Sequence, residues 1–211
     1  AKGFTVESAR PVTIAQAFCD EDGESGVLRL TGAGAKTLSG ASTVSRIVVD
    51  GGAVAFTGGV GSTVVVTGGN RVSFGGSATA EHPLGGLVLG DAATEGVLEV
   101  RPNETICIAS APEFGRVRLA LADGFAIGDK VVFNTKGTLS AASAAAWTRM
   151  QVVSGLPSGA AWTVSAEDVA GGQTLTLEII DGTPIVLTVD EGTESIETNV
   201  SFSVSQRLDV Q

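Results

Sequence analysis

Acidic side chains are concentrated near the N-terminus, where Asp20, Glu21, Asp22 and Glu24 surround Gly23. Hard cations such as Ca²⁺ bind several carboxylate oxygens on a tight loop, so Asp20, Asp22 and Glu24 are candidate Ca²⁺ ligands. The segment lacks both the ligand spacing of an EF-hand loop and the nonapeptide repeat of calcium-binding solenoids. A solvated turn is the favoured interpretation, and a calcium site is the alternative.

Residues that could support catalysis are few and scattered. His82 is the only histidine, and no G-x-S-x-G nucleophile motif accompanies it. Glu95 and Glu113 are separated by nearly one period of the glycine repeat described below and could form the carboxylate pair of a glycoside hydrolase, but no other group converges on them. The sequence also lacks a phosphate-binding glycine loop and the spacing of zinc ligands. We therefore expect no enzymatic activity, no catalytic residue and no cofactor.

Paired glycines recur through the first half of the chain, at positions 51–52, 58–59, 68–69, 75–76 and 85–86. The gaps between successive pairs alternate between a shorter and a longer spacing, and the alternation repeats with a period of 17. Short β-branched segments such as 46–50 and 62–67 lie between them. A period this short is too small for a repeat of two helices, whereas glycine allows the sharp corners between stacked short strands. The pattern predicts an all-β fold, a parallel β-helix (β-solenoid) whose coils each correspond to one period.

The glycine register divides the chain. It predicts a β-solenoid over residues 1–122, and its loss near Asp123 assigns residues 123–211 to a C-terminal β-rich cap that could be continuous with the solenoid. Ser140 and the alanine run behind it predict one short helix over 140–150, with Trp147 as the apolar anchor that closes the solenoid end. Further strands are predicted at 161–165, 174–180 and 184–190.

Residues 200–210 alternate between apolar and polar side chains, which predicts a strand with one dry face. Such a strand pairs with a sheet edge in its own cap or in a neighbouring subunit. Cys19 and Cys107 are about five periods apart along the chain, which places them too far apart along the solenoid axis for a disulfide. We therefore expect two free, mostly buried thiols.

Charge and composition exclude several classes of partner. The formal net charge of −10 disfavours nucleic acid and anionic membranes. No apolar run approaches the length of roughly 18 residues that a transmembrane helix needs, so we expect no membrane insertion of this segment. Aromatic residues make up 5% of the chain and tyrosine is absent, a composition that suits stacked short strands better than a helical enzyme core.

Residues 26–40 read GVLRLTGAGAKTLSG and follow an apolar strand segment at 11–18. This run resembles the autotransporter-associated β-strand repeat of large surface or secreted passenger proteins in Gram-negative and related bacteria. The similarity covers residues 11–56, with a looser one at 155–179. The resemblance implies a right-handed β-helix on the cell surface and brings no catalytic group. The positions that match the repeat are Gly26, Leu28, Leu30, Gly32, Ala33, Gly34, Thr37, Leu38, Ser39 and Gly40.

These observations predict a secreted or cell-surface structural or adhesive β-helix protein with an extracellular location. Its expected partner is a cell-surface or extracellular polymer, or another copy of itself. One alternative is a carbohydrate-binding or carbohydrate-active β-helix protein, which requires a groove lined by acidic and aromatic residues. Another is a fibre or surface-layer subunit that assembles by strand addition.

Overall fold

The computed structural model describes residues 3–20 and 25–182. The strands predicted at 184–190 and 200–210, and the candidate calcium ligands Asp22 and Glu24, lie outside the described residues. Within the described ranges the chain forms 17 strands and one helix.

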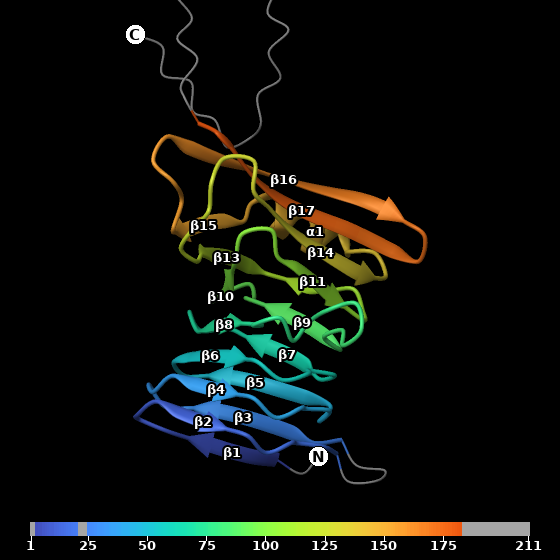
Figure 1. Ribbon diagram of the computed structural model, residues 1–211. Coiled ribbons are helices and arrows are strands. Elements are labelled where there is room, and N and C mark those ends of the chain that lie inside the picture. The colour runs from blue at the N-terminus through green and yellow to red at the C-terminus, as the bar shows by residue number, and fades with distance from the viewer. Residues whose placement is uncertain (1–2, 21–24, 183–211) are drawn as a thin grey trace, which may run out of the picture.

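Two long parallel sheets form the walls of the molecule (Figure 1). Neighbouring strands within both sheets run parallel, so the chain passes from one sheet to the other on each coil. This arrangement is a parallel β-helix, as the sequence predicted. The first sheet contains, in spatial order, β1 (Gly3–Glu7), β3 (Val27–Thr31), β5 (Arg46–Asp50), β7 (Thr63–Val66), β9 (Gly86–Leu89) and β12 (Glu113–Phe114). The second contains β2 (Val12–Ile14), β4 (Lys36–Leu38), β6 (Ala53–Phe56), β8 (Arg71–Ser73), β10 (Glu95–Val100), β13 (Arg116–Leu121) and β15 (Gln151–Ser154).

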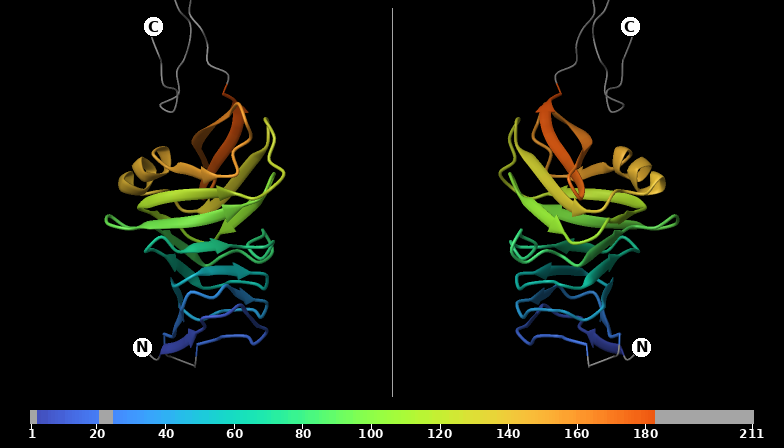
Figure 2. Two further views of the ribbon diagram at one scale, coloured as in Figure 1. Left: turned by 90° about the vertical axis from the view of Figure 1, so that its left-hand side faces the viewer. Right: turned by 90° about the vertical axis from the view of Figure 1, so that its right-hand side faces the viewer.

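A third side closes each coil. In the N-terminal coils it consists of isolated parallel bridges that join Phe18 to Ser42 and Ser42 to Val60. Towards the C-terminus it becomes a four-stranded sheet in the order β11-β14-β17-β16, with bounds Thr105–Ile108, Lys130–Lys136, Gly172–Asp181 and Ala160–Val169. β11 and β14 are parallel, whereas β14, β17 and β16 are antiparallel. The antiparallel strands lie across the C-terminal end of the stack (Figure 2).

Apolar ladders fill the interior of the coils. Leu30, Val49 and Val66 are register neighbours in the first sheet, and each is at most 1% exposed. Phe56 and Phe74 stack with their ring centroids 5.7 Å apart. Each inward side chain therefore packs on its neighbour one coil above or below, so burial is shared along the whole stack.

The coil length is not constant, in contrast to the predicted period. The coil from Arg46 to its partner Thr63 has the predicted length, whereas the coils from Val27 to Arg46 and from Thr63 to Gly86 are longer. In the second sheet the number of residues per coil varies more widely. The coil from Lys36 to its partner Val54 is short, and the coil from Arg118 to its partner Gln151 is long. The strands keep their register while the loops between sheets accept insertions, because surface loops tolerate added length.

The period of 17 predicts that Gly51, Gly68 and Gly85 occupy equivalent corners, and this equivalence fails at Gly85. Gly51 and Gly68 follow β5 and β7 at a corner, whereas Gly85 precedes β9. A Cβ atom on Gly85 would lie 2.1 Å from the carbonyl oxygen of Gly61. Close contact between coils requires glycine at Gly85 and also at Gly51, where a Cβ atom would lie 2.7 Å from the backbone nitrogen of Gly32, whereas Gly68 has a positive φ of 67°.

The helix α1 spans Ala141–Thr148 and begins at the predicted N-cap, Ser140. Trp147 is 1% exposed and packs between Phe114 and Phe133, with ring centroids 5.6 and 5.4 Å away. Its indole nitrogen donates to the backbone oxygen of Ser165 at 3.1 Å. Trp147 thus anchors the helix to the last coils, as predicted, whereas the antiparallel strands lie across the solenoid end that Trp147 was expected to close. α1 stands at the side of the stack (Figure 2). No helix in the described ranges has the length and apolar character to span a membrane.

Strand pairing crosses the predicted division at residue 122. β15 lies beyond that residue and extends the second sheet by pairing with β13.

Candidate functional site

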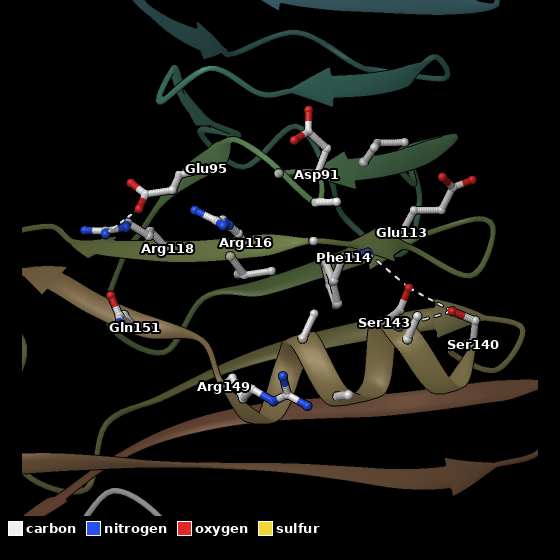
Figure 3. A pocket seen from close by; sticks show the side chains of 18 residues that line it. Asp91, Glu95, Glu113, Phe114, Arg116, Arg118, Ser140, Ser143, Arg149 and Gln151 are labelled. Carbon is white, nitrogen blue, oxygen red and sulfur yellow. Dashed lines mark hydrogen bonds and ion pairs between the residues drawn. The ribbon is translucent and has the colours of Figure 1, made fainter.

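A cleft of about 1100 Å³ lies between α1 and the outer surface of the last coils (Figure 3). It exists because the chain makes a long excursion between β13 and β15. The step from Arg118 to its partner Gln151 is much longer than the preceding step from Glu95 to Arg116. The longer step contains β14 and α1, so the helix becomes a second wall facing the strands.

Three arginines, Arg116, Arg118 and Arg149, lie towards one end of the cleft (Figure 3). Arg116 and Arg118 flank the buried Val117 on β13, so both side chains point away from the core. Arg118 forms an ion pair with Glu95 of the adjacent strand β10. Arg116 and Arg149 are exposed, and neither has a salt bridge to another described residue. Two guanidinium groups are therefore available to a ligand.

Asp91 lines the cleft near Arg116, but its carboxylate is occupied within its own turn. One oxygen accepts from the backbone nitrogens of Ala93 and Thr94 at 2.8 and 2.6 Å, and the other accepts from the Thr94 hydroxyl at 2.9 Å. The backbone hydrogen bonds from Thr94 and Ala93, followed by the Thr94 hydroxyl, lower the pKa of Asp91, and the charge of Arg116 adds to this effect. Asp91 therefore stays ionised and fixes the turn beside the cleft.

Glu95 and Glu113, which the sequence spacing made a possible carboxylate pair, both line this cleft, but the two side chains are at opposite ends (Figure 3). Glu95 is engaged by Arg118, while Glu113 is exposed. The carboxylates of a glycoside hydrolase flank a single bond. Glu95 and Glu113 do not form such a pair in this structure.

No family model, curated protein or solved structure matches this chain. The functional argument therefore rests on the geometry of its own residues, and the resemblance to the autotransporter-associated repeat stays a prediction.

Asp20 joins neighbouring segments of the first coils. One of its carboxylate oxygens accepts from the backbone nitrogens of Gly26 and Ser45 at 2.7 and 3.1 Å, and the other accepts from the Ser45 hydroxyl. The Ser45 hydroxyl is the largest cause of the lowered pKa of Asp20. Among the residues that the structure describes, no three His, Cys, Asp or Glu side chains gather as metal ligands would. Since the other two calcium candidates are not described, the calcium site stays untested.

The remaining candidates lie away from the cleft. His82 is exposed in a turn, where its backbone groups bond to Thr79. Both cysteines are free, as predicted, and Cys107 is half-buried. The prediction that both are mostly buried is wrong for Cys19, which is exposed. The preceding Phe18 packs against the core, and neighbouring residues of an extended segment face opposite sides.

Lys36 is a buried charge that the sequence reasoning missed. It is 1% exposed and points into the coil, and its ammonium group donates to the backbone oxygens of Gly32, Gly34 and Gly51 at 2.8, 2.8 and 3.3 Å. Burial lowers the pKa of Lys36. The alternation with Leu38, the next residue but one, is the sequence signal that places Lys36 on the inner face. Its position makes it a structural residue that holds the corner.

Proposed function

We propose that this chain is a secreted or cell-surface structural protein of the adhesive kind, a rigid rod that presents a binding surface to an extracellular or cell-surface polymer. The observation that carries the proposal is the continuous parallel stack. Six strands pair in one sheet and seven in the other, and apolar ladders run through the interior. Because each coil packs only on its neighbours, such a stack forms a stiff and extended surface.

Two of the three carboxylates in the cleft are already engaged, which favours binding over turnover. Glu95 is paired with Arg118 and Asp91 is held by its own turn, so neither is placed as a proton donor to a ligand. The net charge of −10 suits a protein exposed to solvent. The resemblance of residues 11–56 to passenger repeats supports an extracellular location.

The carbohydrate-binding alternative is supported by the cleft itself, because its lining combines carboxylates with arginines. Its one aromatic residue, Phe114, is 7% exposed and stacks on Trp147. It offers no open ring, so a sugar in the cleft would be held by polar and ionic contacts and not by stacking. Assembly into a fibre by strand addition was inferred from residues 200–210, which are not described, so that alternative stays a prediction.

Two readouts on the wild-type protein test the proposal. Protease treatment of intact cells should remove an epitope-tagged chain while cytoplasmic markers survive. Purified protein should be retained on a panel of immobilised extracellular polysaccharides without changing their chain length. A tag that is protected until the cells are lysed would contradict the location, and shortening of a polymer would contradict the non-enzymatic role.

A further inference from the structure

We propose that the cleft between α1 and β13 binds an acidic polysaccharide, whose anionic groups are held by Arg116 and Arg149. This inference rests on the proposed function and names the chemistry of the polymer. It assigns the binding surface to one place on the rod.

The charge distribution is the first support. The chain carries a net charge of −10, whereas the lining of this cleft balances three arginines against three carboxylates. Glu95 pairs with Arg118, while Asp91 stays ionised beside Arg116 and directs its carboxylate oxygens to Ala93 and Thr94. This leaves Arg116 and Arg149 without a salt bridge in the described part of the chain. A guanidinium group binds carboxylate or sulfate through two parallel hydrogen bonds, which makes it the natural partner of an anionic ligand.

The opposite end of the cleft favours a sugar over an acidic peptide. Glu113 is exposed there, on the far side from the arginines (Figure 3). A carboxylate accepts hydrogen bonds from hydroxyl groups but repels a second carboxylate. An acidic sugar carries anionic groups for the arginines and several hydroxyl donors per unit for Glu113, whereas a run of acidic amino acids offers Glu113 only its backbone N–H groups.

The size and rigidity of the cleft also suit an acidic polysaccharide. Its volume of about 1100 Å³ slightly exceeds the roughly 300–1000 Å³ of ordinary small-ligand pockets, so it has room for more than one sugar unit. One wall is the outer face of β13, which is fixed by pairing with β10 and β15. The other wall is α1, which Trp147 ties to the core. Such walls are preorganised, so binding costs little ordering of the protein.

The experiment measures the binding of alginate oligosaccharides, which carry carboxylates, to the wild-type chain by calorimetry at low and moderate salt. Dextran sulfate oligosaccharides test the sulfate form of the same chemistry, and neutral maltooligosaccharides of matched length are the control. Polyglutamate tests the acidic-peptide outcome. The variants are Arg116→Ala and Arg149→Ala, with Arg46→Ala as the matched control, since Arg46 is an exposed arginine on β5 far from the cleft.

We expect saturable binding of at least one anionic oligosaccharide and none of the neutral one. Each cleft variant should raise the dissociation constant by about tenfold or more, the change that follows from losing one charge-assisted hydrogen bond. Arg46→Ala should bind like wild type. Hydrogen exchange on the wild-type protein gives a measurement without substitutions, and the bound oligosaccharide should slow exchange at the end of α1.

Three results would overturn the inference: no binding of either anionic oligosaccharide at low salt, cleft variants that bind like wild type, or polyglutamate binding as tightly as the sugars. Failure of the inference is distinguishable from failure of the proposed function. If the cleft variants are still fully retained on extracellular polysaccharides, the protein binds these polymers through another surface, and only the inference about the cleft fails.

Discussion

Two adjacent glycines give a sharp test of how the coils stack. A Cβ atom on Gly58 would lie 2.5 Å from the backbone oxygen of Ser39 and 2.6 Å from that of Gly40, which belong to the preceding coil. On Gly59 the same atom would meet nothing within 4 Å. Gly58→Ala must therefore push two coils apart, and we expect a loss of about 1–3 kcal/mol in the free energy of unfolding. Gly59→Ala should be neutral or stabilising by roughly 0.4–1 kcal/mol, because it restricts the unfolded chain.

The assay is chemical denaturation followed by circular dichroism, with wild type and both variants at one protein concentration. The two substitutions are chemically identical and lie side by side, so general effects of alanine on strand and loop propensity nearly cancel. If these coils stack as described, Gly58→Ala should unfold at a lower denaturant concentration than wild type, and Gly59→Ala should not. Equal losses at both positions, or a neutral Gly58→Ala, would refute the close approach of these two coils.

Three further predictions concern Lys36, Trp147 and the two cysteines. Burial lowers the pKa of Lys36 in the folded protein below the ordinary 10.5. Between the folded and unfolded pKa values the unfolded state binds more protons, so the free energy of unfolding of the wild type should rise with pH up to about 10.5 relative to that of Lys36→Met. Denaturation of both proteins at several alkaline pH values measures this difference, and a difference that does not change with pH would contradict the prediction. Trp147→Ala removes a buried ring that contacts two other rings. We expect the free energy of unfolding of the C-terminal end to fall by about 3–5 kcal/mol, with little change in the N-terminal coils. Hydrogen exchange should become faster in α1 and β16 and stay slow in β3 and β5. Faster exchange throughout the protein would contradict a stack in which each coil is stabilised only by its neighbours. The exposed Cys19 should react with a thiol reagent in the native state faster than the half-buried Cys107, and equal rates would contradict their placement.

The sequence predicted the fold because strand and turn chemistry are local. The glycine pairs and the segment at 46–50 specified a β-solenoid, and the alanine run behind Ser140 specified the helix. The constant period was wrong because the loops between the sheets differ in length, so that Gly85 precedes β9 in contact with Gly61 of the coil below and does not lie at a corner. Such a contact depends on the length of every loop between the two glycines, which spacing alone does not give.

The candidate site was less predictable. The outward direction of Arg116 and Arg118 follows from strand alternation, but Arg149 lies far along the chain from Arg116 and reaches the same cleft only because α1 folds back on β13. The spacing of Glu95 and Glu113 suggested a pair that the structure does not form, because Glu95 pairs with Arg118 of the adjacent strand, a contact that depends on side-chain placement across two strands. Local pattern therefore predicted the scaffold, and tertiary packing decided which charges remain available.

The central claim, that this rod binds an extracellular polymer without altering it, is tested most directly by one measurement. Wild-type protein is incubated with soluble acidic polysaccharide, and bound fraction and polymer length are read together by size-exclusion chromatography with light scattering. We predict co-elution of protein with polymer of unchanged mass and loss of co-elution at high salt, because the contacts are electrostatic. Polymer that becomes shorter with time, or protein that elutes alone at low salt, would contradict the account.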